Sequence, residues 1–188
     1  MLSEAVKALP RGRLEELVEI YCKDWLAMDG VWFQSIEKKF GMDEAMEHDV
    51  AAWSRFTVIE AQKIKKFLSL PDRAGLDGLE QALRLRLYAN INDDEILREG
   101  NRLVYRTLDC RVQSARSRKN MPWHPCLEVG IVEYGAFART IDDRITCRAL
   151  SCYPQRTDET CACSWEFIFH EDSSSGALRH TGPRLRPG

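Results

Sequence analysis

Apolar residues recur at intervals of three and four through the first third of the chain, which is the spacing of an amphipathic helix. The pattern predicts one long helix over residues 14–40 and a second over about 44–68. Gly41 is expected to end the first helix, Asp43 to cap the second at its start, and Pro71 to stop it. The apolar positions of the first helix are Leu14, Leu17, Val18, Tyr21, Trp25, Met28, Trp32, Ile36 and Phe40.

The spacing of the apolar residues changes in the middle of the chain. A short third helix is expected over residues 76–87, and it leads through a turn into a strand. Apolar and polar side chains alternate from Leu85 to Ile91, which is typical of a half-buried strand. Residues 99–101 have the composition of a turn, so residues 103–110 are expected to return as the partner strand of a hairpin.

The rest of the chain predicts a second hairpin that follows a helix. Residues 111–125 are basic and contain two prolines, so we expect irregular structure there. Helical spacing returns over residues 127–141, and residues 144–152 and 164–169 have the composition of strands. Residues 170–188 are poor in apolar side chains and are expected to form a disordered tail.

The order of these elements predicts the fold class. Helices, a hairpin, a helix and a second hairpin follow one another, which favours an α+β fold over a repeated βαβ array. We expect an antiparallel sheet of about four strands with an inserted helix. Residues 1–169 would form a single domain, with a helical part at 13–70 and a sheet part at 85–169.

Composition narrows the classes of function. Of 188 residues, 44% are hydrophobic and 30% charged, as in a soluble globular protein, and the net charge is −2. That charge gives no general attraction to nucleic acid or to an anionic membrane, so neither is expected as a partner. The N-terminus lacks the apolar segment of a secretory signal, and no run reaches the length of a membrane span, so we expect a cytoplasmic protein.

Seven cysteines are the most prominent candidates for chemistry. Disulfides are rare in the cytoplasm, so these side chains are expected to be free thiols, metal ligands or redox groups. Four of them suffice for a tetrahedral zinc site, although the tight C-x2-C pair is absent; the alternative is that they are ordinary buried thiols. The candidate ligands are Cys110, Cys126, Cys152 and Cys163, with Cys147 and Cys161 as substitutes.

Charged and aromatic residues supply further candidates. Arg116 and Arg118 lie in a basic stretch and are candidates to bind a carboxylate, the alternative being a solvated loop. Glu133 and Asp142 are candidate general bases, but Asp142 fits a turn with a local ion pair equally well. The helical tryptophans Trp32 and Trp53 belong either to the core or to the wall of a pocket for a small apolar molecule.

Several short stretches together resemble a known family. Over residues 13–169 the chain resembles an uncharacterised prokaryotic cytosolic family, itself similar to the L-2-amino-thiazoline-4-carboxylate hydrolase-like proteins. The C-terminal half distantly resembles the 4-vinyl reductase type of small-molecule-binding domain. The residues that carry the likeness are Asp24-Trp25-Leu26-Ala27-Met28-Asp29-Gly30-Val31-Trp32-Phe33, Trp53 with Ile59-Glu60-Ala61, Cys110 with Gln113, Ala115, Arg116 and Arg118, Pro125-Cys126, Ile141-Asp142 with Arg144, and Cys152 with Cys163-Ser164-Trp165-Glu166-Phe167.

The resemblance implies a function and part of a ligand set. The vinyl-reductase-like domains bind small aromatic or hydrocarbon ligands, and several hold zinc through cysteines near the last strand pair. By position, Cys152 and Cys163 match those cysteines, while Ala149 stands where the pattern has a glutamate.

Three hypotheses follow. The first is a small-molecule-binding domain with a structural zinc site. The second is a metal-dependent hydrolase of a small ring carboxylate, in which Arg116 or Arg118 holds the carboxylate and Asp142 or Glu133 is the base. The third is an interaction module that forms a homodimer through the N-terminal helices.

Overall fold

The computed structural model describes residues 2–171 and has the α+β fold that the sequence predicts. The expected tail at 170–188 falls, beyond Glu171, outside the described residues. The helices are α1 (Glu4–Lys7), α2 (Arg11–Phe40), α3 (Met42–Phe67), α4 (Gly75–Leu83), the 3-10 turn η1 (Tyr88–Asn90), α5 (Arg111–Arg118) and α6 (Leu127–Ile141). The strands are β1 (Asp93–Glu99), β2 (Arg102–Asp109), β3 (Ile145–Ser151) and β4 (Cys163–Phe169).

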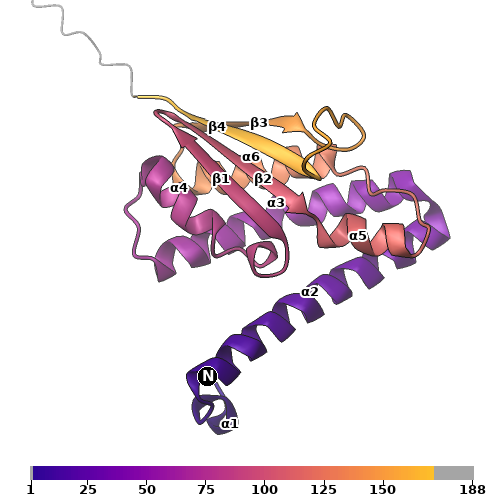
Figure 1. The fold of residues 1–188 in the computed structure, drawn as a ribbon, viewed down its shortest axis with the longest axis horizontal. Helices are drawn as coiled ribbons and strands as arrows, with labels where there is room; N and C mark the ends of the chain where they lie inside the picture. The colour runs from indigo at the N-terminus through magenta and orange to yellow at the C-terminus, as the bar shows by residue number, and fades with distance from the viewer. Residues whose placement is uncertain (1, 172–188) are drawn as a thin grey trace, which may run out of the picture.

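The four strands form one antiparallel sheet in the order β1-β2-β4-β3. The second predicted hairpin is present as β3 and β4, whereas in the first hairpin β2 pairs with β1 at Asp93–Glu99 and not with the predicted strand at 85–91. The two hairpins join through β2 and β4 at the centre of the sheet. Figure 1 shows α6 and α3 behind this sheet, with α4 at one end and α5 at the other. The molecule is thus a stack of sheet, α6, α3 and α2, because α6 contacts β3 and α3, and α3 contacts α2.

The main core lies between α6 and the sheet. Alternate residues of β2 and β4 point toward α6, among them Tyr105, Trp165 and Phe167, which are almost fully buried. Gly130 of α6 lies against the indole of Trp165, and a Cβ at this position would come within 2.3 Å of the ring. The absence of a side chain at Gly130 is what lets this large residue pack flat against the helix.

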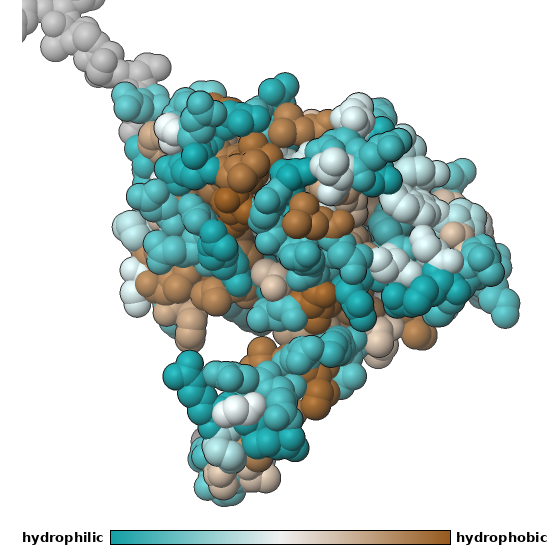
Figure 2. All heavy atoms as spheres, in the orientation of Figure 1, coloured by the Kyte–Doolittle hydropathy of each residue, from teal (hydrophilic) through white to brown (hydrophobic). Residues whose placement is uncertain are grey.

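A second, smaller core joins α2 to α3 through Phe33, Met46 and Trp53. The N-terminal half of α2 and the short α1 extend away from the body (Figure 1). Figure 2 shows hydrophobic residues at the surface of this projecting part. Tyr21 is 58% exposed and Trp32 is 68% exposed, so Trp32 belongs to neither core.

The segment at 85–91 differs from the prediction, because it is no strand. Helix α4 ends at Leu83, and the chain then turns through η1 before β1 begins at Asp93. The carboxylate of Glu60 accepts a hydrogen bond from the backbone N–H of Leu87 and one from the Arg86 side chain. These side-chain contacts replace the ladder bonds of a strand, and the apparent alternation belongs to a helical turn.

Two further predictions are wrong. Residues 111–118 form helix α5 rather than a loop, because the prolines come later and arginine, glutamine and alanine are good helix formers. Helix α3 begins at Met42 with Gly41 as its N-cap, so Asp43 lies inside the first turn, where its charge suits the helix dipole. None of the helices in the described part of the chain is both long and apolar enough to cross a membrane.

Candidate ligand-binding cavity

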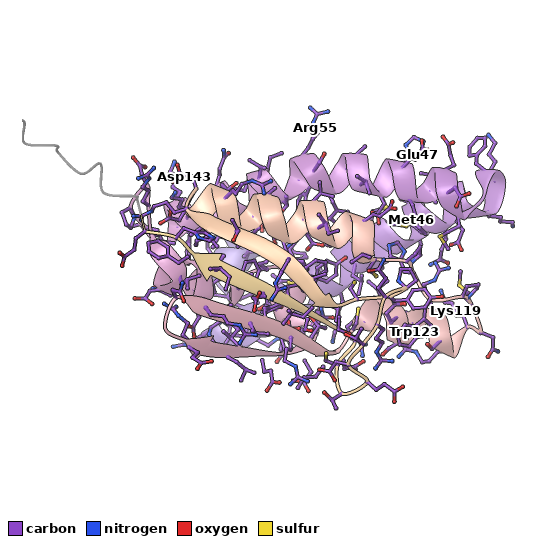
Figure 3. The ribbon with its side chains drawn as sticks, turned by 90° about the horizontal axis from the view of Figure 1, so that it is seen from above. Met46, Glu47, Arg55, Lys119, Trp123 and Asp143 are labelled. Carbon is purple, nitrogen blue, oxygen red and sulfur yellow. The ribbon has the colours of Figure 1, made fainter. Side chains whose placement is uncertain are left out.

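A cavity of about 470 Å³ lies where α2 passes the end of the sheet next to α5. Its walls come from α2, α3, η1, α5 and α6 together with the end of β2 and the start of β4. Figure 3 places Lys119 and Trp123, which follow α5, at this end of the domain, with Met46 and Glu47 of α3 nearby. Segments far apart in the sequence therefore enclose one space.

Aromatic rings form two of the walls. Trp53 and Tyr88 stack with their centroids 5.7 Å apart, at an interplanar angle of 21°. Tyr134 and Trp165 stack at 4.7 Å and 25°. Stacked rings of this kind present flat, rigid apolar surfaces. The cavity is therefore shaped for contact with a planar apolar group.

Two carboxylates from the long helices also line the cavity. Burial raises the pKa of Asp29 to about 6, and the charge of Asp49 adds to this rise, while His124 and a hydrogen bond with Tyr88 oppose it. Asp49 Oδ2 lies 3.1 Å from His124 Nε2, and both side chains are about nine-tenths buried. The interior at this point is acidic and largely closed to water.

A third carboxylate, Glu133 of α6, reaches the cavity from the core side. Its Oε1 lies 2.6 Å from Arg86 Nη2, and the same nitrogen lies 2.9 Å from Glu60 Oε2. Burial raises the pKa of Glu133 to about 7, and the charge of Arg86 opposes this rise. Burial alone would lower the pKa of Arg86, but the charges of Glu60 and Glu133 hold it well above its usual value, so the guanidinium stays charged.

The four cysteines proposed as zinc ligands all line this one cavity. A hydrogen bond with Cys152 and then burial raise the pKa of Cys163, while burial raises that of Cys110 to about 12 and places that of Cys126 well above its usual range. The thiols of Cys110, Cys126 and Cys163 are therefore protonated at neutral pH and form a soft, weakly polar lining. Within residues 2–171, no three or more Cys, His, Asp or Glu side chains form a group that would hold a metal ion. Zinc stays a prediction, and no step below depends on it.

Of the remaining candidate residues, some line the cavity and others lie elsewhere in the fold. Arg116 lines the cavity, but its guanidinium is held by Glu37, with Nη1 and Nη2 donating at 2.9 and 2.7 Å, and by the carbonyl of Pro122. Arg118 lines a second, shallower pocket of about 380 Å³ on the other side of α5. Trp32 is exposed on α2, and Asp142 is fully buried at the far end of α6, so neither is among the residues that line the cavity.

The sequence interpretation missed Asp29, Asp49, Arg86 and Tyr88. Arg86 and Tyr88 fell in the segment wrongly predicted as a strand. A signal for the two aspartates was present, because Asp29 lies four residues from both Trp25 and Phe33, and Asp49 lies four residues before Trp53. A carboxylate on the apolar face of a helix is unusual enough to indicate a buried polar site.

The comparisons with known proteins add one finding. Residues 7–169, which include every element that lines the cavity, match a protein-family model described as "Family of unknown function (DUF6125)". No curated protein matches the chain.

Proposed function

Because this chain belongs to the Family of unknown function (DUF6125), we propose its function from the cavity itself: the domain binds a small molecule between α2, α6 and the end of the sheet. The observation that supports this proposal is the composition of the walls. Stacked aromatic pairs enclose the space, and a small number of buried carboxylates face it. Pockets for small molecules combine a mainly apolar wall with a few well-placed polar groups in this way.

The size of the cavity agrees with such a ligand. Small-molecule sites usually measure roughly 300–1,000 Å³, and this one measures about 470 Å³. That volume suits a molecule with one or two rings. The protonated thiols add polarizable surface without adding charge, which also favours contact with an aromatic or sulfur-containing group.

A thermal-shift screen tests the proposal. The panel contains aromatic amines and amidines, aromatic acids, and neutral ring compounds such as indole, with hits confirmed by calorimetry. Ala27 lines the cavity from the exposed side of α2, so Ala27→Trp should block the space without disturbing the core. Ala52→Trp on the exposed face of α3 is the matched control.

We expect at least one class of compound to raise the melting temperature of the wild type and the Ala52→Trp variant, but not of Ala27→Trp. If no compound in the panel binds, or if Ala27→Trp binds as well as the wild type, the cavity is not a ligand site.

A second candidate function rests on the pKa of Glu133. A carboxylate with a pKa of about 7 that lines a cavity is suited to accept a proton from water at neutral pH. In the hydrolase that the sequence resemblance suggests, the water oxygen would bond to the ring amidine carbon while its proton passes to Glu133. The bond from that carbon to a ring heteroatom would then break, and the heteroatom would take up the proton.

Turnover of 2-amino-thiazoline-4-carboxylate, followed by chromatography with and without added zinc or manganese, tests this candidate. Activity that Glu133→Gln removes would support it. Binding without turnover would leave the domain as a binding protein.

A further inference from the structure

Three carboxylates line the cavity, those of Asp29, Asp49 and Glu133. Behind Glu133, Arg86 is shared by two carboxylates, those of Glu60 at 2.9 Å and Glu133 at 2.6 Å. Asp49 is paired with His124, and Asp29 receives a hydrogen bond from the neutral hydroxyl of Tyr88. These three carboxylates and Glu60 thus share one permanent cation and one histidine, and this group of side chains carries a net negative charge whichever form His124 takes.

The other basic residues around the cavity do not correct this imbalance. Arg116 is neutralised by its two contacts with Glu37. Lys23 is exposed and pairs with Glu19 at 2.6 Å, and Lys119 is exposed to solvent. Arg111, at the start of α5, is half-buried at the cavity wall. Of the four cations at the cavity wall, the two lysines therefore lie toward solvent, Arg116 is buried but already paired, and Arg111 is half-buried.

The buried carboxylate of Glu133 has one cation beside it. Its Oε1 is sequestered from water and lies 2.6 Å from Arg86 Nη2, a nitrogen that also lies 2.9 Å from Glu60 Oε2. One guanidinium therefore serves two buried carboxylates. Because Glu133 lines the cavity, a donor on a bound molecule can reach it.

We propose that the ligand of this cavity is a planar apolar ring that carries a protonated nitrogen, an amine or an amidinium, which binds at the carboxylates of Asp29 and Glu133. The inference rests on the proposed function of the cavity and specifies its ligand class. The nitrogen adds a positive charge beside Asp29 and Glu133, and it donates hydrogen bonds to their carboxylate oxygens. The ring lies against the stacked pairs Trp53–Tyr88 and Tyr134–Trp165, whose faces attract both a ring and a nearby cation.

The binding should depend on pH. Asp29 must be ionised to attract the cation, so protonation of its carboxyl, whose pKa is raised to about 6, weakens binding as the pH falls. The other charged and titratable groups that line the same cavity are Lys23, Asp49, Tyr88, Arg111, Arg116, Lys119, His124, Glu133, Tyr134 and the four thiols.

The test compares three probes of nearly the same shape: benzamidine, a cation; benzamide, which is neutral; and benzoate, an anion. Calorimetry on the full chain measures their affinities at about pH 8 and about pH 5, on either side of the Asp29 transition. Asp29→Asn is the variant that removes the charge. Asp24→Asn, an exposed carboxylate of the same helix that does not line the cavity, is the control, and melting curves verify that both variants fold.

We expect benzamidine to bind at least about tenfold more tightly than benzamide, which is the usual value of one hydrogen-bonded charge. Benzoate should bind more weakly still. Asp29→Asn should lose about the same factor for benzamidine and nothing for benzamide, and Asp24→Asn should behave as the wild type.

Benzamide or benzoate binding as tightly as benzamidine, with Ala27→Trp blocking both, would overturn the cationic ligand and leave the small-molecule site intact. An Asp29→Asn variant that binds benzamidine like the wild type would also overturn it. If neither these probes nor the wider panel bind at all, both proposals fail.

Discussion

Helix α6 positions two buried carboxylates that the sequence suggested as candidate bases, and their surroundings differ. At the C-cap, Asp142 accepts hydrogen bonds from the backbone of Gly75 at 2.8 Å and from the Arg144 backbone and side chain at 2.8–3.0 Å. The Arg144 side chain in particular lowers its pKa to about 2. At the middle of the helix, Glu133 shares one guanidinium with Glu60, and burial raises its pKa to about 7.

The difference lies in the supply of donors, because both side chains are buried. Asp142 is surrounded by donors and ties α6 to the start of α4, so its carboxylate has no free lone pair to offer a ligand. Glu133 lies beside the cavity, and its one cationic partner, Arg86, is shared with Glu60. Figure 3 shows how far apart the two environments are, with Asp143 at one end of the domain and Lys119 and Trp123 at the other.

The largest expected effect on stability comes from removing the carboxylate of Asp142. Asp142→Ala leaves the N–H of Gly75 and the guanidinium of Arg144 without their acceptor, and we expect the free energy of unfolding to fall by about 3 kcal/mol. Urea titration measures this loss. Asp143→Ala is the control, since its pair with Arg73 is exposed and worth less than about 1 kcal/mol. Equal losses in the two variants would contradict the structural role of Asp142.

The next effect concerns the wall of the cavity. In Gly130→Ala the new methyl group would lie 2.3 Å from the Trp165 ring, so the indole must move. We expect a loss of about 2 kcal/mol and a change in the near-UV circular dichroism of Trp165. At Gly30 a Cβ meets only the end of Gln34 at 3.8 Å, so Gly30→Ala should stabilise α2 by up to about 1 kcal/mol. An unchanged spectrum in Gly130→Ala would show that the ring does not depend on this contact.

A smaller effect is expected in the pH dependence of stability, to which Asp142 and Glu133 contribute with opposite signs. The pKa of Asp142 is lowered in the folded state, so its contribution to stability is present above its unfolded pKa and is lost as the pH falls from about 4 to about 2. The pKa of Glu133 is raised, so the folded state loses stability from this group as the pH rises from about 4.5 to about 7.

Glu133→Gln removes the second of these trends. The variant should therefore lose less stability than the wild type between pH about 5 and about 8, as measured by urea titration at each pH. Parallel pH profiles for the variant and the wild type would show that Glu133 does not titrate in this range.

The smallest effect on stability is expected at the surface of α2. Trp32→Ala should change the free energy of unfolding by less than about 0.5 kcal/mol, because the side chain is 68% exposed. The homodimer expected from the sequence predicts that the same variant lowers the mass measured by light scattering toward that of a monomer. A wild type that is monomeric at every concentration would exclude this dimer.

The sequence predicted most of the fold where periodicity persisted over whole elements. The helices at 14–40 and 127–141 and the strands at 103–110 and 164–169 are all confirmed within a few residues. The segment at 85–91 failed, since the buried pair of Arg86 and Glu60 is a tertiary contact that no local pattern contains. Helix α5 failed because a basic segment was interpreted as a loop.

The site was predictable only in part. The four candidate cysteines, Trp53, Glu133 and Arg116 all border the cavity, although no pattern in the sequence indicates that α2 closes it. The roles assigned to these residues stay predictions. Asp29 is the most informative omission, because its importance depends on lying opposite Asp49 and His124, which belong to other segments of the chain.

Helix α2 supplies one wall of the cavity from Lys23 to Gln34, and the other walls belong to elements that the main core holds in place. Substitutions on one face of one helix can therefore change the shape and charge of the site while the sheet and α6 keep their packing. Phe33 and Trp25 are exceptions on this helix, because they pack in or against the second core. If the cavity binds the proposed ligand, a library confined to the other cavity-lining codons between 23 and 34 would vary the selectivity of the site and leave both cores unchanged.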